Sequence, residues 1–174
     1  MTIQEPISKS LHDAHGEAVN DINRWRGYCL DRYSRAEAGL RQAIGVMRDH
    51  PDGARLKRPS LFGQHVEVMT AAVALDGPFA GPGSKVRDAL AKCANGFTHR
   101  NIVTHAVGSV WLDRHGSWLW HYEFHPAGKG KPVLTGTLTQ LEAKQLEREL
   151  KSTFQSLDSH LQSFIKTLHP AAKP

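Results

Sequence analysis

The chain has little cysteine and no long apolar run. Its 174 residues include two cysteines, Cys29 and Cys93, which are far apart and form no CxxC pair. Neither a disulfide framework nor a zinc finger is therefore expected. The longest apolar run, residues 69–75, is far shorter than the roughly 20 residues that a membrane-spanning helix needs. With no secretory segment either, we expect a cytoplasmic protein that is not integral to a membrane.

Acidic residues are outnumbered by basic ones. The chain has 17 Asp and Glu against 22 Lys and Arg, a net charge of +5, and a pI near 9.4. This balance favours anionic partners, nucleic acid among them. Many of the arginines, however, lie along residues 24–48 with acids between them, as on a solvated helix face, so plain solubility explains the charge equally well.

Apolar residues recur at helical spacing in four segments of the chain. These segments are residues 12–49, 60–75, 84–107 and 139–168. The first helix should end at the proline and glycine of residues 50–53. Ser60 can cap the start of the second helix. Thr139 and Glu142 satisfy both halves of a capping box at the start of the last helix. The length suits one domain, residues 1–174, with a core from about 12 to 168.

A β-hairpin is expected between the third and fourth helices, over residues 109–135. The even positions from Trp118 to Phe124 are all aromatic, and period-two alternation sends them to one face while His121, Glu123 and His125 take the other. Residues 132–135 could add an edge strand. The predicted fold class is therefore mainly α, four helices with one small hairpin.

A polar cluster interrupts the third helical segment, where residues 98–106 read THRNIVTHA. Asn101 and His105 are four residues apart and share one face of a helix. Arg100 points about 100° away from Asn101, but its long side chain can bend back toward an anion held there. The spacing therefore predicts an anion site beside an imidazole.

This combination suits cleavage of RNA without a metal. A histidine with a reference pKa of about 6.5 can take or give a proton near neutral pH, which assigns that role to His105. Arg100 would stabilise the charge that grows on the phosphoryl oxygens when the ribose 2′-hydroxyl attacks, and Asn101 would orient the histidine or bind a phosphate oxygen. His99, the adjacent polar residue, would contact substrate from the surface beside Arg100.

The residues from Arg100 and Asn101 to His105 resemble the signature of the HEPN superfamily, an arginine followed after four to six residues by a histidine. The resemblance implies an up-and-down four-helix bundle with the motif late in its third helix. It also implies a metal-independent endoribonuclease of toxin–antitoxin or phage-defence systems, which acts as a homodimer and pairs with an antitoxin or defence partner. Ala106 stands where a glycine is frequent in the family, and alanine still permits close packing.

Two other interpretations stay open. The same bundle could be a non-catalytic module for dimerisation or partner binding, in which Arg100 and Asn101 only form structural hydrogen bonds. His121, Glu123 and His125 could ligate zinc from one face of a strand, but no fourth ligand is evident, so we expect no metal and no cofactor. Aromatic residues of the hairpin could stack nucleic-acid bases, although packing against the helices explains most of them better. These are Trp111, Trp118 and Trp120.

Overall fold

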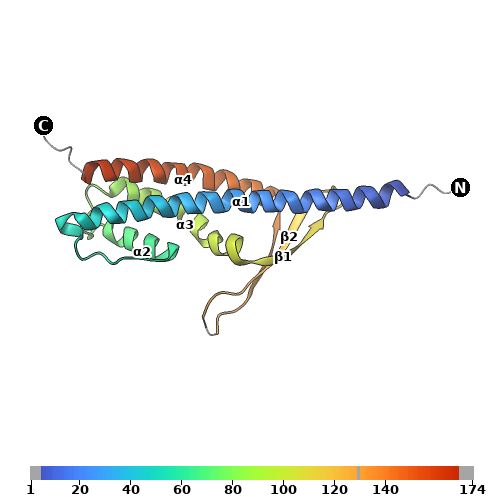
Figure 1. Cartoon of the computed structure of the whole chain (residues 1–174), viewed down its shortest axis with the longest axis horizontal. Helices are drawn as coiled ribbons and strands as arrows, with labels where there is room; N and C mark the ends of the chain where they lie inside the picture. Colours follow the sequence, from blue (N-terminus) through green and yellow to red (C-terminus); the bar gives the residue numbers. More distant parts are fainter. Residues whose placement is uncertain (1–4, 129, 169–174) are drawn as a thin grey trace. The chain divides into compact units, whose positions relative to one another are not determined.

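A computed structural model describes residues 5–128 and 130–168, with side chains from residue 11 onward. These residues form four α-helices, a short 3-10 helix and three strands (Figure 1). In chain order the elements are α1 (Glu5–Asp49), η1 (Pro51–Gly53), α2 (Phe62–Ala72), α3 (Ser84–His105), β1 (Val107–Leu112), β2 (Trp118–Phe124), β3 (Leu134–Thr139) and α4 (Gln140–Leu168). The mainly helical fold class is confirmed, and the up-and-down bundle stays a prediction. In the described part of the chain, no helix is both long and apolar enough to span a membrane.

The chain forms two compact units. Unit 1 consists of Met1–Leu30 and His99–Arg148, and unit 2 of Asp31–Thr98 and Glu149–Pro174. The boundary falls within α1, α3 and α4, so each of these helices contributes residues to both units. The polar cluster of α3 from His99 onward lies in unit 1 together with all three strands.

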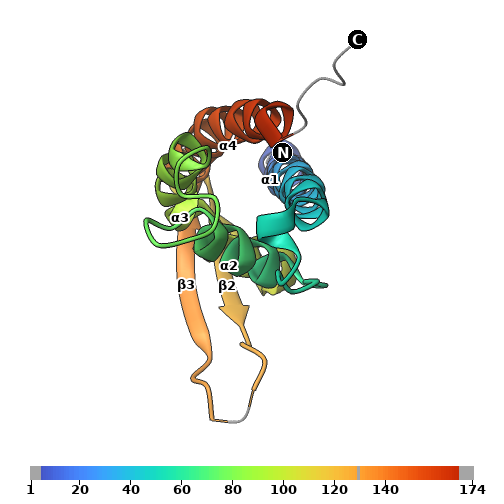
Figure 2. The same ribbon diagram turned by 90° about the vertical axis from the view of Figure 1, so that its left-hand side faces the viewer.

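The sheet of unit 1 has three antiparallel strands in the order β1-β2-β3, so the expected two-stranded hairpin is wrong. Residues Leu134–Thr139 pair along β2, from Phe124 opposite Leu134 to Leu119 opposite Thr139 (Figure 2). Gly136 obscures this strand in the sequence, because glycine is poor at forming strands. In the structure, a Cβ at Gly136 would lie 2.5 Å from the hydroxyl oxygen of Tyr122, so the tyrosine ring fills the place of the missing side chain.

The turn between β1 and β2 is held by the side chain of Asp113. The carboxylate of Asp113 accepts hydrogen bonds from the backbone N–H groups of His115, at 2.8 Å, and Ser117, at 2.9 Å. These bonds lower the pKa of Asp113, with the bond from Ser117 contributing most. Gly116 has a φ of +80°, a conformation that glycine adopts readily.

The helix ends follow local hydrogen bonding. The capping box of α4 is confirmed, because Thr139 N–H donates to Glu142 Oε2 at 2.8 Å and Glu142 N–H donates to Thr139 Oγ1 at 3.1 Å. The predicted cap by Ser60 is wrong. Instead, the side-chain oxygen of Gln64 accepts from the backbone N–H groups of Ser60 and Leu61, and α2 begins at Phe62. Helix α3 ends at His105 rather than 107, because the chain enters β1 at Val107.

Three tryptophans form the centre of unit 1. The ring of Trp25 in α1 lies 6.4 Å from that of Trp118 and 6.1 Å from that of Trp120. The indole N–H of Trp25 donates to the carbonyl oxygen of Ala143 at 3.0 Å. One residue of α1 therefore connects the sheet to the first turn of α4.

Aromatic rings from all four helices form the centre of unit 2. Phe97 of α3 lies between Phe62 of α2, at 5.3 Å, and Phe154 of α4, at 5.5 Å. The hydroxyl of Tyr33 in α1 donates to the carbonyl oxygen of Gly96 at 2.8 Å. A Cβ at Gly96 would lie 2.8 Å from a methyl carbon of Leu150, so glycine allows α3 and α4 to approach closely.

Candidate functional site

The end of α3 is held by Arg26 of α1, a residue that the sequence did not single out. Its Nε donates to the carbonyl oxygen of Val103 at 3.0 Å, and its Nη2 donates to that of Ala106 at 3.3 Å. A guanidinium at these carbonyls satisfies acceptors that have no partner within the helix and favours the negative end of the helix dipole. Arg26 also lies over Trp120, with its central carbon 5.1 Å from the ring centroid. The last turn of α3 is thereby fixed against the sheet.

Asn101 and His105 are both exposed, whereas Val103 and Ala106 are buried. The four-residue spacing within α3 puts Asn101 and His105 on one face, as the sequence predicts. The expectation that they interrupt the apolar stripe is wrong, because both lie beside it in solvent. Only Arg100 of this motif is half-buried.

Arg100 turns toward Asn101. Its Nη1 donates to Asn101 Oδ1 at 3.3 Å, and its backbone carbonyl accepts from the hydroxyl of Thr104 at 2.7 Å. This hydrogen bond brings a permanent positive charge to the face that Asn101 shares with His105. The bending back that was expected of Arg100 is therefore present as a contact with Asn101.

His99 faces elsewhere. It lines a cavity of about 220 Å³ with Ile102, Trp120 and Tyr122, on the side of α3 that faces the sheet. Glu142 lines the same cavity, and the bonds from Thr139 that cap α4 lower the pKa of its carboxyl group. On a helix, His99 lies about 200° from Asn101, so the two residues do not share a face. The structure does not bring His99 together with the other predicted site residues.

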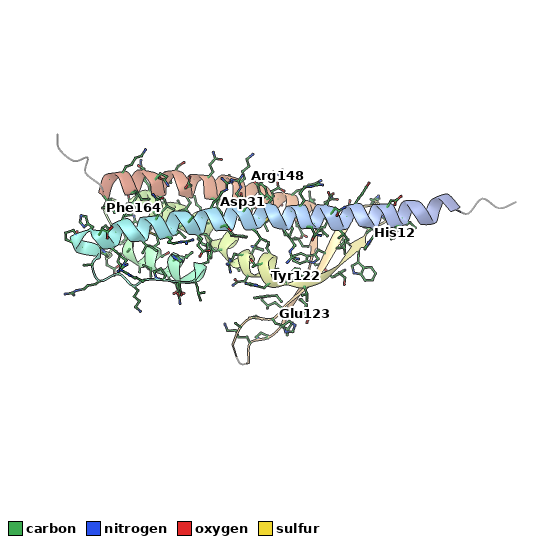
Figure 3. All side chains as sticks on the ribbon, in the orientation of Figure 1. His12, Asp31, Tyr122, Glu123, Arg148 and Phe164 are labelled. Carbon is green, nitrogen blue, oxygen red and sulfur yellow. The ribbon has the colours of Figure 1, made fainter. Side chains whose placement is uncertain are left out.

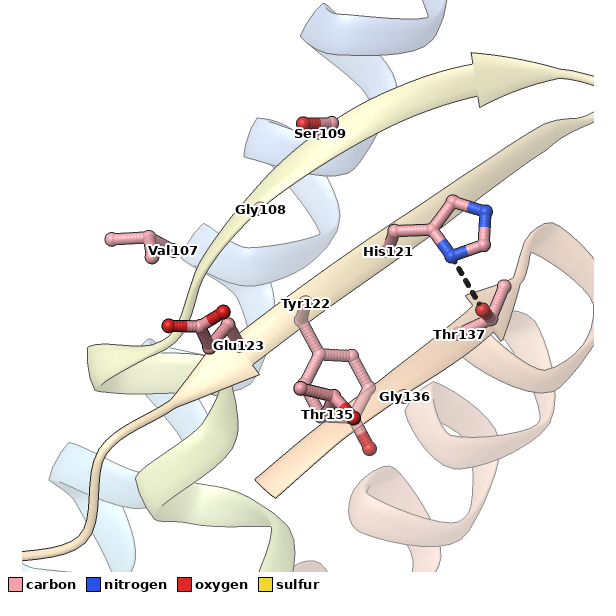
Figure 4. Close-up of a pocket in the computed structure, with 9 residues that line it drawn as sticks. All are labelled: Val107, Gly108, Ser109, His121, Tyr122, Glu123, Thr135, Gly136 and Thr137. Carbon is pink, nitrogen blue, oxygen red and sulfur yellow. Dashed lines mark hydrogen bonds between the residues drawn. The ribbon is translucent and has the colours of Figure 1, made fainter. Parts of the chain in front are cut away.

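A larger open cavity of about 650 Å³ lies over the outer face of the sheet (Figure 4). Two rows of paired residues cross its floor. One row is Val107, Glu123 and Thr135, and the other is Ser109, His121 and Thr137. His121 Nδ1 and Thr137 Oγ1 form a hydrogen bond of 2.6 Å, which Figure 4 shows as a dashed line. Tyr122 and Glu123, which are labelled in Figure 3, are consecutive on β2, so strand alternation sends their side chains to opposite faces.

The sheet cavity begins next to the α3 motif. Val107 lines the cavity and is two residues beyond His105. An extended chain advances at most about 3.6 Å per residue, so the Cα atoms of His105 and Val107 are within about 7 Å of each other. The backbone of α3 therefore ends within two residues of a cavity lined by hydroxyl, imidazole and carboxylate groups.

The three residues considered as zinc ligands have other partners. His121 bonds to Thr137, and the ring of His125 pairs with the carboxylate of Glu123. Within residues 5–128 and 130–168, no group of three or more His, Cys, Asp and Glu side chains is arranged to hold a metal ion. The strand positions alone put these residues on one face, but the three side chains do not surround a common point.

Neither cysteine is a candidate nucleophile. Burial raises the pKa of Cys29 to about 12, with a further contribution from the charge of Glu147. Burial also raises the pKa of Cys93 to about 11, although a hydrogen bond with Thr153 opposes the shift. Both thiols are therefore protonated at neutral pH, and a protonated thiol is a poor nucleophile.

The tryptophans of the sheet divide between its two faces. Trp118 and Trp120 are buried against Trp25, so the packing role expected of most of them is confirmed. Trp111 is 58% exposed on the outer face, with its ring edge-on to that of His121 at 6.2 Å. It is the large aromatic residue that the outer face offers to a ligand.

Comparison of the chain with protein-family models, with curated proteins and with solved structures found no match. The interpretation of this site consequently depends on the residues themselves.

Proposed function

We propose that this protein is a metal-independent endoribonuclease of the HEPN type, in which Arg100, Asn101 and His105 form the reactive site. The observation that supports this most is that Asn101 and His105 are exposed on one face at the end of α3, with Arg100 bonded to Asn101. An accessible imidazole can transfer a proton near neutral pH, and a nearby guanidinium can stabilise the charge on the phosphoryl oxygens during cleavage of a phosphodiester. A role in a toxin–antitoxin or phage-defence system follows from the family resemblance.

The reaction begins with attack of a ribose 2′-hydroxyl on the adjacent phosphorus. His105 takes the hydroxyl proton as the new bond between the 2′-oxygen and phosphorus forms. Arg100 and Asn101 stabilise the negative charge that increases on the phosphoryl oxygens. The bond to the 5′-oxygen breaks, and that oxygen accepts a proton. The products are a 2′,3′-cyclic phosphate and a free 5′-hydroxyl.

A homodimer would complete this chemistry. One copy of the motif offers one histidine, His105, whereas the reaction needs a base for the 2′-hydroxyl and an acid for the leaving oxygen. Two copies facing one cleft supply both groups. We therefore expect a dimeric mass at micromolar concentration in sedimentation equilibrium, and a strictly monomeric mass would argue against this arrangement.

The sheet cavity is a suitable place for the substrate next to the cleaved bond. Its volume of about 650 Å³ is in the range of small-molecule sites, so it can hold a nucleotide. Ser109, Thr135 and Thr137 supply hydroxyl groups on its floor, and Trp111 is exposed on the same face of the sheet for stacking on a base.

The test is cleavage of total RNA and tRNA in excess EDTA by the wild type, His105→Ala and Arg100→Ala. Removing a general acid–base group should lower the cleavage rate about 100-fold or more. Arg114→Ala and His115→Ala are matched controls, because this pair is also exposed in unit 1 and also hydrogen-bonded, but lies in the turn after β1. The controls should cleave at the wild-type rate.

The product ends test the mechanism separately. Products ending in a 2′,3′-cyclic phosphate, lost in both motif variants, would support attack by the 2′-hydroxyl. Cleavage that needs added metal, or that persists in both variants, would exclude the mechanism. If folded wild type cuts neither RNA, the non-catalytic partner-binding module becomes the better interpretation, and His105→Ala should then leave partner affinity intact.

A further inference from the structure

A second polar cavity, far from the α3 motif in sequence, lies in unit 2. It has a volume of about 270 Å³ and is lined by α1, by the loop before α2 and by α2 itself. Its lining residues are Arg41, Ile44, Gly45, Arg48, Arg58, Pro59 and His65. Three of the seven carry a guanidinium group, and none of these described lining residues is acidic.

Helical spacing places two of the arginines on one face of α1. Arg41 and Arg48 are seven residues apart, which is about two turns, and Gly45 lies between them on the same face. Nothing lies within 4 Å of the place where a Cβ of Gly45 would be. The floor between the two arginines therefore has no side chain and is open to a ligand.

The loop that follows α1 carries the third arginine. A Cβ at Gly53 would lie 1.8 Å from the carbonyl oxygen of Met47, so glycine lets the chain turn back tightly against the end of α1. Arg48 Nε then donates to the carbonyl oxygen of Leu56 at 3.2 Å and holds the loop. Arg58 is thereby placed on the wall of the cavity, across from α1.

His65 of α2 adds a buried polar group. Its side chain is among the cavity's lining residues although the residue is only 4% exposed. Its Nδ1 bonds to the carbonyl oxygen of Leu61 at 2.9 Å and lies 3.9 Å from a carboxylate oxygen of Glu37. A buried imidazole is therefore part of the lining of this cavity.

Two of the three arginines of this cavity form no ion pair within the described part of the chain. Arg41 and Arg58 are exposed, and in the described part of the chain no carboxylate forms an ion pair with either. Guanidinium groups that line one cavity repel one another, and an anion bound between them relieves this repulsion. The cavity therefore has the charge and the open floor of an anion site.

We propose that this cavity binds the terminal phosphate of a small phosphorylated molecule. A phosphate monoester carries nearly two negative charges and three acceptor oxygens, which matches several planar guanidinium forks better than a single carboxylate does. The volume of about 270 Å³ is just below that of ordinary ligand pockets, which suits a phosphate and a small attached group rather than a long chain. Binding here does not depend on RNA cleavage, because no residue of the α3 motif takes part.

Isothermal titration calorimetry of the full chain at 150 mM salt tests this site, with inorganic phosphate, a nucleoside 5′-monophosphate and the same nucleoside as ligands. The two phosphates should bind and the nucleoside should not. Arg41→Ala and Arg58→Ala should each weaken binding by about tenfold or more, as expected for loss of a charge-assisted hydrogen bond. Arg35→Ala is the matched control, because Arg35 is exposed on the same helix but pairs with Asp31, and it should bind like the wild type.

Gly45→Phe is a second test that removes no charge. Nothing lies within 4 Å of a Cβ at Gly45, so the new side chain starts in open space, and we expect its ring to cover the floor between Arg41 and Arg48. This variant should lose phosphate binding while keeping its thermal transition. Tighter binding of the monophosphate than of inorganic phosphate would identify a phosphorylated metabolite as the ligand, and equal binding would identify the free anion; both outcomes support the site.

Three results would overturn it. The first is that neither phosphate binds to folded wild type at millimolar concentration. The second is binding that Arg41→Ala, Arg58→Ala and Gly45→Phe all leave unchanged. The third is that an RNA oligonucleotide binds much more tightly than both phosphates and that its affinity falls steeply with salt. That result would mean that the arginines contact the phosphate backbone of nucleic acid.

Discussion

The two faces of the sheet in unit 1 differ in the polarity and burial of their side chains. The inner face carries Trp118 and Trp120, which are buried against Trp25 of α1. The outer face carries His121 together with residues that are hydroxyl-bearing, charged or exposed. This face lines the large cavity of unit 1. Both faces come from the same strands by simple alternation. The inner face therefore stabilises unit 1 by burial, whereas the outer face is exposed and lines a cavity.

The largest contrast should come from two tryptophans of this sheet. Trp120→Ala removes a ring that is 2% exposed and should lower the free energy of unfolding by about 3–5 kcal/mol. Trp111→Ala removes one that is 58% exposed and should change it by about 0.5 kcal/mol or less. Urea unfolding followed by circular dichroism measures both. Equal losses would mean that the two faces are packed alike.

Substitution of Arg26 tests how much the stability of the inner face of the sheet depends on one cation. Arg26→Ala removes two hydrogen bonds to the end of α3 and the contact with Trp120, and should cost about 2 kcal/mol in unfolding free energy. Arg24→Ala on the same helix removes a solvent-exposed pair with Asp21 and should cost under about 0.5 kcal/mol. If both variants unfold at the wild-type urea concentration, Arg26 does not fix α3.

The capping box at the junction of β3 and α4 should give a smaller, pH-dependent effect. Glu142→Ala should cost about 1 kcal/mol at pH 7, whereas Glu142→Gln should retain most of the box. Hydrogen bonds from Thr139 lower the pKa of Glu142 in the folded state, so its contribution is complete above the unfolded pKa of about 4.3 and is lost as pH falls through the lower folded pKa.

Thermal unfolding of both variants across pH 2–7 measures this effect. The gap between wild type and Glu142→Ala should narrow at acid pH, and Glu142→Gln should show less change with pH than wild type. A gap that stays constant over the whole range would show that the carboxylate charge does not contribute.

Fluorescence quenching should distinguish the faces without altering stability. Of the four tryptophans, Trp25, Trp118 and Trp120 are each 6% exposed or less, so iodide should reach mainly Trp111. Trp111→Phe should therefore remove most of the quenchable emission, with the thermal transition unchanged. Quenching that persists in this variant would place a second indole in solvent.

Local signals were predictive where the deciding contacts lie close together in the chain. Thr139 and Glu142 are three residues apart, so the sequence contains both halves of the cap that begins α4. The four-residue spacing of Asn101 and His105 likewise settled that they share a face. Ser60 misled because its hydroxyl donates to the side-chain oxygen of Gln64 at 3.3 Å, and the helix begins one residue later with Leu61 at the N-cap.

The features that sequence reasoning missed or misplaced depend on distant residues. The edge strand considered over residues 132–135 lies at Leu134–Thr139, where the ring of Tyr122 on the neighbouring strand occupies the space beside Gly136. Arg26 is one of many arginines in α1, and nothing local indicates that it meets Val103 and Ala106. The signal that could have found it is general: the last carbonyls of a helix need donors, and a cation on a packed neighbour can supply them.

By itself, the sequence determined the helical segments, the aromatic inner face of β2 and the pairing of Asn101 with His105 on one face, because a helix or strand repeats its side chains at a known period. Only the tertiary structure decided that residues of three strands line one cavity and that Arg41, Arg48 and Arg58 line another. The physical reason is that such sites join residues through the turns and packing of separate elements. Those contacts depend on shape and on close approach of backbones, as at Gly53 and Met47, and a one-dimensional pattern does not encode them locally.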